Sequence, residues 1–509
     1  MLKNNVLVKK PTDVLKYGYK YILVHPKMIL PFMIYEAGVI VGQAVIVIAF
    51  LALLSYFRAF NLIPKIADFI IKGNFEALTS PEIIQPIIVT LSIAGVAYLF
   101  TIIVFDSFVK AGLYPFLQKL LVEKEVSTRY FLESAFRNWI NVFKTNMLIY
   151  LFTAAPLIPS IMLFYFSLEK IVKGSIEELG FSALTFIAGV IIALIIYLAL
   201  IFAPIAASVD ANTPVQSIIR SITIAKTELG AIILYFSALI AVSLIAIAIE
   251  SAVETFYVTL GSLVSIIISL AIIPILHLYL VAVYEAHNNE AFQQPTETKL
   301  TLKLAYKTLN KGLKLVKMFF TTKYGFLALT LTLIVFMLGF GLGYLTVDPE
   351  IRSVLINSGI IVPGKLNPEF KVYNRIFLGL DIFFHNWRTS LSTAMSGIVY
   401  AIPSTISTLF NGYVIGVIFA TINDPLRASA IILPHGIIEI PAFLLSSASG
   451  ILLGFKMIMY RRRQVTLNEL SQDLEKTAIF VIGLSLVFLV AGIIESNITP
   501  LIAEMAGWK

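Results

Sequence analysis

The segment Pro434-His435-Gly436-Ile437-Ile438-Glu439 places two ionisable side chains inside a long apolar run, residues 428–457. His435 and Glu439 are four residues apart, so they lie on one face of a helix, about one turn from each other. Both side chains are costly to expose to lipid, and we expect them to face protein or water. Pro434 favours the first turn of a helix, which predicts that a helix begins there.

The composition of the whole chain indicates a membrane protein. Of its 509 residues, 58% are hydrophobic and 13% are charged, whereas soluble domains are about 45–50% apolar and about 25% charged. No cleavable signal peptide is predicted, because the first 27 residues carry six lysines and no long apolar core. The absence of cysteine excludes disulfides, thiolate catalysis and metal sites built on cysteine.

Apolar stretches of about 20 residues are long enough to span a bilayer as helices. We count about eleven, which predicts an all-α, polytopic bundle with six spans in the first half and five in the second. The stretch 411–422 is too short to cross alone, and we expect it to be a broken or tilted helix joined to its neighbours. The predicted spans are 28–57, 81–106, 146–167, 181–206, 230–250, 258–284, 324–346, 388–409, 411–422, 428–455 and 477–500.

The distribution of basic residues predicts how the chain is oriented in the cell membrane. If the N-terminus is cytoplasmic, the segments on the inner side carry 26 of the 38 Lys and Arg residues. Basic residues favour the cytoplasmic side, so we predict a cytoplasmic N-terminus and an external C-terminus. The net charge of +8 is explained by these loops. The inner segments are 1–27, 107–144, 207–229, 286–323 and 456–476.

We predict an N-terminal six-span domain (1–285), a basic amphipathic cytoplasmic linker (286–323) and a C-terminal five-span domain (324–509). Five lysines of the linker form a stripe at helical spacing, which favours a membrane-surface helix attracted to anionic lipid. The alternative is a solvated connector whose lysines only enforce topology. Nucleic-acid binding is not expected, because no stacking aromatic residues or groove-reading motif accompany the lysines. These lysines are Lys303, Lys307, Lys311, Lys314 and Lys317.

Four short motifs follow one another in the C-terminal domain. They are Phe383-Phe384-His385-Asn386, Phe410-Asn411-Gly412, Pro434-His435-Gly436 with Glu439, and Glu495 with Thr499-Pro500. In this order they resemble the stage II sporulation protein M (SpoIIM/DUF95) family, a membrane domain of five spans. The resemblance covers about 185 of the 509 residues and not the N-terminal half. It implies a non-enzymatic envelope protein that acts through other membrane proteins.

The polar residues of these motifs are expected to form one cluster inside the membrane, because burying each alone would cost several kcal/mol. One interpretation is structural, with hydrogen bonds between helices that set their register. Another is a proton or ion site. A catalytic metal is less favoured, since the His-Glu-x-x-His pattern is absent and few histidines are available; we predict no metal and no cofactor. The cluster comprises Asn386, Asn411, His435, Glu439 and Glu495.

A second set of residues is predicted to pack helices closely. Small residues four positions apart let helix backbones approach each other, either within the domain or against a partner. They are Gly412, Gly416, Ser446, Gly450 and Gly454.

The sequence favours a non-enzymatic membrane scaffold or complex subunit of the cell envelope. No loop is long enough for a catalytic domain, and no nucleophile or phosphate-binding motif is present in a soluble segment. The alternative is a transporter or channel that uses the His435–Glu439 site. Expected partners are the lipid bilayer and other membrane proteins, with a homo-oligomer as a further option and no nucleic acid.

The orientation can be tested with the cysteine-free chain as background. We expect a cysteine at Arg462 to be cytoplasmic and one at Trp508 to be external, because of the charge distribution. An impermeant thiol reagent on intact cells should therefore label position 508 and not position 462. The reverse labelling pattern would overturn the predicted orientation.

Overall fold

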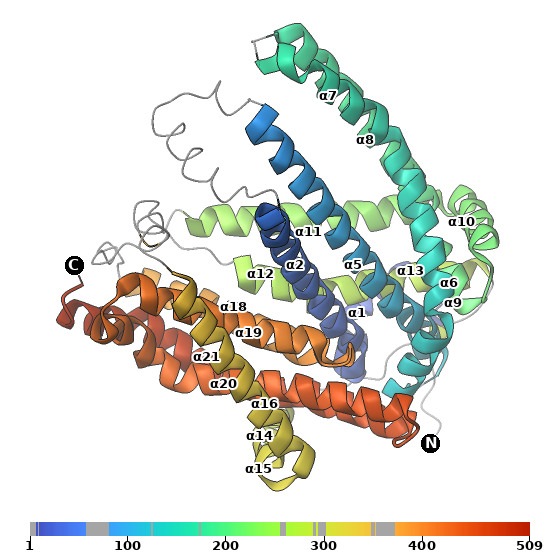
Figure 1. Ribbon diagram of the computed structural model, residues 1–509. Helices are drawn as coiled ribbons and strands as arrows, with labels where there is room; N and C mark the ends of the chain where they lie inside the picture. The colour runs from blue at the N-terminus through green and yellow to red at the C-terminus, as the bar shows by residue number, and fades with distance from the viewer. Residues whose placement is uncertain are drawn as a thin grey trace, which may run out of the picture. The chain divides into compact units, whose positions relative to one another are not determined.

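A computed structural model of the chain describes residues 7–8, 10–56, 81–123, 126–172, 175–254, 261–288, 292–293, 302–347, 352 and 372–508. These residues are helical apart from turns and a two-residue antiparallel pairing of β1 (Leu7–Val8) with β2 (Phe292–Gln293), which confirms the predicted all-α class (Figure 1). In this part of the chain, nine helices are long and apolar enough to cross a membrane. The number becomes ten if the bent pair over residues 12–39 counts as one span, against the predicted eleven.

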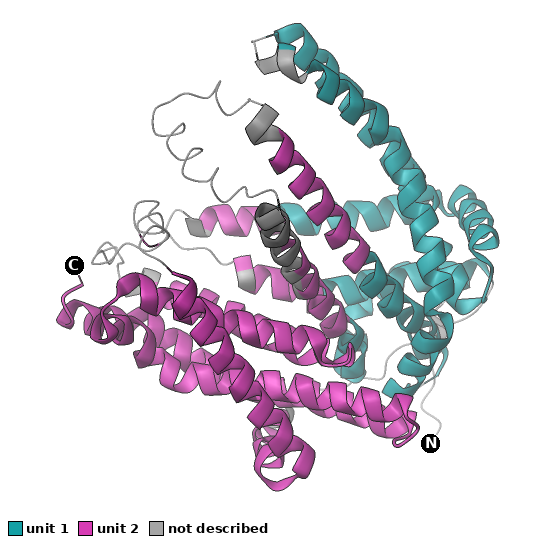
Figure 2. Ribbon diagram, viewed as in Figure 1, with its two compact units in different colours: residues 1–31, 103–244, 271–298 teal, residues 32–102, 245–270, 299–509 magenta. Residues whose placement is uncertain are grey.

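The chain divides into two compact units, and each unit is assembled from segments that are not consecutive in the sequence (Figure 2). Unit 1 comprises residues 1–31, 103–244 and 271–298, and unit 2 comprises residues 32–102, 245–270 and 299–509. Unit 2 thus combines the family-like C-terminal part with segments from the first half. The predicted domain boundaries at residues 285 and 323 stay a prediction.

Unit 1 is built from helices whose polar ends are tied to one another by side-chain hydrogen bonds. Asn138 Nδ2 donates to the carbonyl of Ser208 at 2.9 Å, and Asn141 Nδ2 donates to the carbonyl of Ala207 at 3.0 Å. These bonds satisfy carbonyls at a helix end that have no partner within the helix. The helices of unit 1 are α1 (Thr12–Val24), α6 (Thr128–Ala154), α7 (Ile158–Val172), α8 (Ile176–Ala199), α9 (Ala203–Val209), α10 (Pro214–Thr227) and α13 (Ile273–His287). The long helices α5 (Pro81–Val122) and α11 (Leu229–Glu254) contribute to both units.

Unit 2 contains the candidate site. Its helices are α2 (Leu30–Tyr56), α12 (Gly261–Ile267), α14 (Leu302–Lys314), α15 (Met318–Thr321), α16 (Lys323–Thr346), α18 (Val372–Met395), α19 (Ile402–Ile422), α20 (Pro425–Arg461) and α21 (Leu467–Met505). Short 3-10 turns extend α14 at Leu315–Lys317 and α18 at Ser396–Ile398.

Glycines bring α16 and α19 into backbone contact. A Cβ atom on Gly412 would lie 2.2 Å from the carbonyl oxygen of Phe336, and one on Gly416 would lie 2.1 Å from that of Phe340. From the other side, a Cβ on Gly343 would lie 2.0 Å from the carbonyl oxygen of Tyr413. Only glycine fits this crossing, so these small residues pack the unit internally.

A buried ion pair ties α2 to α18 within unit 2. Glu36 is 3% exposed, and its Oε2 atom lies 2.7 Å from Arg388 Nη2 and accepts from Arg388 Nε at 2.8 Å. Removing one member of such a pair leaves an uncompensated buried charge, which costs about 3–5 kcal/mol. This pair is one reason why α2 groups with the C-terminal helices.

The predicted spans 388–409 and 411–422 are wrong in their boundaries. α18 ends at Met395, and a turn with left-handed Tyr400 (φ 53°) and Ala401 (φ 66°) precedes α19. Pro403 lies in the first turn of α19, where its missing N–H is tolerated. The apolar run of 411–422 is the second half of α19, which is a single 21-residue helix.

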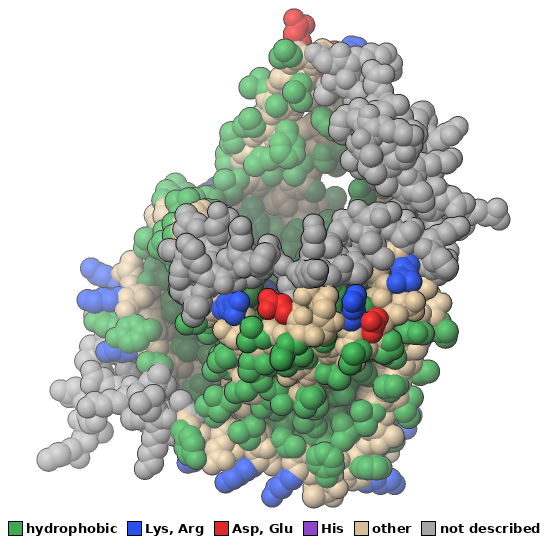
Figure 3. All heavy atoms as spheres, turned by 90° about the vertical axis from the view of Figure 1, so that its left-hand side faces the viewer, with side chains coloured by type: hydrophobic (Ala, Val, Ile, Leu, Met, Phe, Trp, Pro, Cys, Tyr) green, Lys and Arg blue, Asp and Glu red, His purple; other side chains and the backbone are tan. Residues whose placement is uncertain are grey.

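One face of the molecule shows a broad apolar band (Figure 3). Charged side chains border the band above and below, with Lys and Arg along the lower edge. An apolar band flanked by charges is the pattern that a bilayer requires of a protein surface.

The side-chain exposures near the C-terminus indicate a better position for the second cysteine of the thiol-labelling experiment. Trp508 is 6% exposed and its Nε1 donates to the carbonyl of Arg427 at 3.2 Å. Met505 is 89% exposed, so a cysteine at Met505 is the better external probe.

The glycine crossing yields a matched pair of substitutions on α16. Gly343→Ala should destabilise the protein by about 1–3 kcal/mol, the usual cost of overpacking, whereas Gly341 has no atom within 4 Å of its Cβ position. Gly341→Ala should therefore be neutral or slightly stabilising. Thermal unfolding of the full chain in detergent measures both variants, and equal midpoints would contradict the crossing.

Candidate intramembrane polar site

His435 and Glu439 lie in the middle of a helix and not at its start. α20 begins ten residues before His435, at Pro425, where Asp424 Oδ1 accepts from the backbone N–H groups of Leu426 (3.0 Å) and Arg427 (3.1 Å). The prediction that a helix begins at Pro434 is therefore wrong, because the aspartate cap fixes the start earlier. Pro434 is an internal proline, and Pro441 is a second one.

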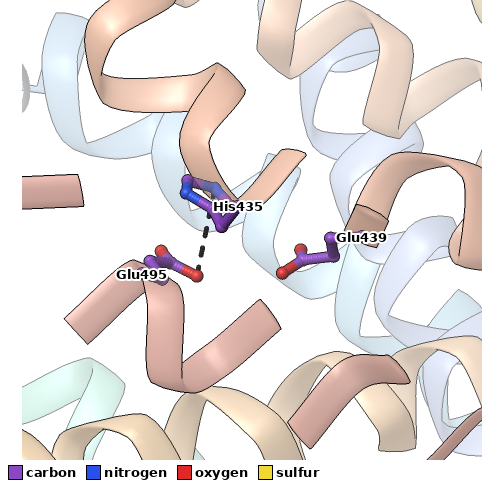
Figure 4. Close-up of side chains that lie close together, drawn as sticks. All are labelled: His435, Glu439 and Glu495. Atoms are coloured by element: carbon purple, nitrogen blue, oxygen red, sulfur yellow. Dashed lines mark ion pairs between the residues drawn. The ribbon is translucent and has the colours of Figure 1, made fainter. Parts of the chain in front are cut away.

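Three ionisable side chains converge between α20 and α21 (Figure 4). His435 Nε2 lies 4.0 Å from Glu495 Oε2. One ligand atom from each of His435, Glu439 and Glu495 lies within 4.8 Å of the others. His435 and Glu495 retain 15% and 32% side-chain exposure, so the cluster is largely enclosed by protein.

A hydroxyl from α21 orients the imidazole of His435. His435 Nδ1 lies 3.2 Å from Thr499 Oγ1, and Thr499 Oγ1 donates to the carbonyl of Ile494 at 3.4 Å. Because the hydroxyl has one proton, its bond to Ile494 leaves it to accept from Nδ1. In the tautomer that carries its proton on Nδ1, His435 donates to this hydroxyl and the lone pair of Nε2 faces Glu495.

Glu439 borders a cavity of about 80 Å³ that Asn386 and Asn411 also line. Phe336, Phe443 and other apolar side chains form the rest of its wall. Asn386 is within hydrogen-bonding reach of the Glu439 carboxylate, yet Glu439 Oε2 is buried and has no hydrogen-bond partner in the described part of the chain. The cavity is large enough for water, which needs about 10–15 Å³ on this measure.

All five residues of the predicted polar cluster are thus brought together within unit 2. Asn386, Asn411 and Glu439 line the cavity. His435 and Glu495 each place a ligand atom within 4.8 Å of one on Glu439. The helices that carry these five residues are α18, α19, α20 and α21.

Sequence reasoning missed a line of hydroxyls that continues from the cavity. Thr393 Oγ1 and Ser407 Oγ are 2.8 Å apart, and Ser396 Oγ and Ser404 Oγ are 3.1 Å apart. Asn411 Nδ2 donates to the carbonyl of Ser407 at 2.8 Å, which joins this line to the cavity. Hydroxyl residues three or four positions apart on α18 and α19 were the available signal.

The small residues predicted to pack helices all lie at internal positions. Gly412 and Gly416 face the backbone of α16, as described above. A Cβ on Gly450 would lie 2.4 Å from Ser404 Oγ, and one on Gly454 would lie 2.3 Å from the backbone N of Ala401. Ser446 is fully buried and donates to the carbonyl of Ala442 at 3.0 Å.

The basic linker helix packs against α21 in unit 2. A Cβ on Gly312 would lie 2.7 Å from the Cα of Gly483, so the two helices cross at these glycines. Four of the predicted lysines, Lys307, Lys311, Lys314 and Lys317, are exposed, and the side chain of Lys303 lies outside the described residues. Their predicted contact with anionic lipid stays a prediction.

A second polar cluster in unit 1 was also missed. Lys110 Nζ lies 2.8 Å from Asp106 Oδ2, and Asn146 Nδ2 donates to the same oxygen at 3.1 Å. The count of loop charges placed Lys110 in a cytoplasmic loop, but its side chain is 19% exposed within α5. The signal was the charged pair four residues apart at the end of an apolar run. Tyr114 and His277 line a small cavity beside Lys110.

The apolar helices and the enclosed polar cluster define a polytopic integral membrane protein. The family model of stage II sporulation protein M matches residues 332–500. An uncharacterised protein of Methanocaldococcus jannaschii is 30% identical over 188 residues, which cover 34% of this chain and 94% of that relative. A second uncharacterised protein of that organism is 28% identical over 128 residues, or 25% of this chain and 59% of the relative. No solved structure matches the chain.

The chain therefore belongs to the stage II sporulation protein M family, through its C-terminal part. The matched region contains Asn386, Asn411, His435, Glu439 and Glu495. It begins within α16 and omits the linker and the N-terminal half.

Two substitutions at Glu439 separate packing from hydrogen bonding. Glu439→Gln keeps the shape and a partner for Asn386, and it should unfold close to the parent. Glu439→Leu leaves the Asn386 amide unpaired, which should cost about 1–3 kcal/mol. Thermal unfolding in detergent measures both, with the exposed residue Glu504 changed to Leu as the control. An unchanged midpoint for Glu439→Leu would argue against a shared site.

Proposed function

We propose that the protein is a non-enzymatic cell-membrane protein that passes a cation across the bilayer through the polar residues of unit 2. The observation that carries the proposal is a row of polar side chains through this unit, linked by hydrogen bonds to one another and to backbone carbonyls and by the shared cavity; it is here called the polar track. It connects hydroxyls near the α18–α19 turn to the ionisable cluster between α20 and α21. It consists of Ser396, Ser404, Thr393, Ser407, Asn411, Asn386, Glu439, Glu495, His435 and Thr499.

The length of the polar track supports passage rather than a local contact. Ser404 lies against Gly450 of α20, and His435 is 15 residues before Gly450 on the same helix. At 1.5 Å per residue this separation is about 22 Å. The hydrocarbon core of a bilayer is about 30 Å thick, so a track of this length covers most of it where α20 runs along the bilayer normal.

The two helices that carry the ionisable cluster are continuous but contain proline beside it. Pro434 and Pro441 flank His435 and Glu439 in α20, and Pro500 follows Thr499 in α21. Proline lacks an N–H group, so each one frees a backbone carbonyl four residues earlier. In membrane transporters, weakened helices of this kind surround cation sites, because free carbonyls assist in coordination.

A membrane scaffold is the second candidate. The glycines that suggested a partner surface are used inside unit 2, which weakens that argument. In its favour, the α7–α8 hairpin of unit 1 exposes apolar residues such as Phe166 (72%) and Leu184 (66%). A surface of this kind fits either lipid or another membrane protein, and the expected homo-oligomer would use it too.

Transport is tested with the full chain in liposomes on a solid-supported membrane. Concentration jumps of H⁺, Na⁺ and Zn²⁺ should produce a current for at least one of these cations. Glu439→Gln should abolish the current, because it removes the charge that the cation meets in the track. Glu504→Gln, on the exposed end of α21, is the matched control and should retain it.

Absence of current for all three cations in the parent protein would overturn the transport proposal. A current that Glu439→Gln leaves unchanged would overturn it as well. In either case, affinity purification from native membranes tests the scaffold, since a scaffold should retain membrane proteins that survive detergent washing.

A further inference from the structure

We propose that His435, Glu439 and Glu495 bind a first-row divalent transition-metal ion, with Zn²⁺ as the representative ion. This inference rests on the proposed function in that it names the cation of the same site. The metal is bound and released as cargo, so no catalytic role is assigned to it.

The distances permit a shared ion after small side-chain movements. The three ligand atoms lie within 4.8 Å of one another. Imidazole nitrogen and carboxylate oxygen bind zinc at about 2.0–2.2 Å, which sets the ligand atoms about 3.4 Å apart in a tetrahedron. Each atom must therefore move by about an ångström or less, within the reach of a side-chain rotation.

The charges of the site call for a divalent cation. Carboxylates bind a metal in their ionised form, so the ligand set of two carboxylates and a neutral imidazole carries a charge of −2 when it binds. One M²⁺ ion brings this charge to zero. Of the other basic groups in unit 2, Arg388 is already paired with Glu36. Within the described residues, no Lys or Arg is paired with Glu439 or Glu495.

The side chains around the three ligands are arranged as outer-shell partners. Metal-binding histidines usually donate their second N–H to an acceptor, which fixes the tautomer. Thr499 Oγ1, 3.2 Å from His435 Nδ1, is placed to be that acceptor and leaves Nε2 toward the carboxylates. Asn386 holds the Glu439 carboxylate, and the buried, unpartnered Glu439 Oε2 is left as the ligating atom.

The donor set selects the class of metal. One nitrogen and two oxygens suit Zn²⁺, Mn²⁺, Fe²⁺ and Co²⁺, whereas Mg²⁺ and Ca²⁺ prefer sites made only of oxygen. The cavity beside Glu439 supplies room for a water as a fourth ligand. No metal was predicted from the sequence, because the His-Glu-x-x-His pattern is absent and histidines are few; the structure brings the Glu495 carboxylate of α21 to the two residues on α20.

The proposal is tested on the purified, full-length protein after treatment with a chelator. Zn²⁺ titration against a chromophoric indicator should show about one tight site per chain, and Mg²⁺ should not compete. His435→Gln and Glu495→Gln each remove a ligand and should weaken binding by more than about 100-fold, the upper limit for loss of an outer-shell partner. Thr499→Val should weaken it by about 10–100-fold.

His385→Gln and Glu504→Gln are matched controls, because they make the same chemical changes outside the cluster. His385 is exposed on α18 and Glu504 is exposed on α21. They should bind Zn²⁺ as the parent does. Elution of each variant as a single species in size-exclusion chromatography shows that it is folded. The conservative Gln substitutions are chosen because they keep size and polarity.

Equal Zn²⁺ binding in the parent and in the ligand variants would overturn the proposal, as would no binding in the parent. The result is separable from that of the transport experiment. A current carried by H⁺ or Na⁺ without Zn²⁺ binding would retain the proposed function and reject the metal. Zn²⁺ binding without any current would retain the metal and reject transport.

Discussion

Lipid offers no hydrogen-bond partner, so every polar group at the depth of the bilayer must find its partner inside the protein. This constraint explains why polar residues from distant parts of the sequence meet in unit 2. Glu36 in α2 pairs with Arg388 in α18, more than 350 positions along the chain. The same requirement gathers His435 and Glu495 from separate helices into one cluster. The arrangement of helices follows from these few pairings as much as from apolar packing.

Proline near the cluster adds a second consequence of this constraint. The interior of an unbroken helix satisfies its own backbone groups, and in lipid this makes it rigid. Pro434, Pro441 and Pro500 each remove one bond beside the ionisable residues. Ala430 and Ser496, four residues before Pro434 and Pro500, are buried, so the carbonyls freed there lie in the protein interior and not next to lipid. The region proposed to bind a cation is therefore also the region where the two helices bend most easily.

The sequence predicted the membrane class and which polar residues meet, because the cost of burying a carboxylate or an imidazole is a local property. Glu439 and Glu495 were expected together on that ground. The sequence did not predict the partner of Glu36, because a pairing across hundreds of residues leaves no periodic signal. The early start of α20 was missed because Pro434 was given more weight than the cap at Asp424. Thr499 was quoted as part of a motif, but its bond to His435 depends on the packing of α21.

The wrong boundaries of the predicted span 388–409 and the missed hydroxyl residues have the same cause. α18 carries Arg388, Asn386 and several hydroxyls, so it falls short of the apolar test that identifies spans in the described part of the chain. The prediction therefore shifted the span to the more apolar residues beyond its end. Several of the polar side chains that lower its hydropathy, Asn386, Thr389 and Thr393 among them, line the cavity or the polar track. A helix enclosed by others and facing a polar interior need not be apolar all round. Hydropathy is therefore a poor guide to a helix such as α18, whose polar side chains face the site.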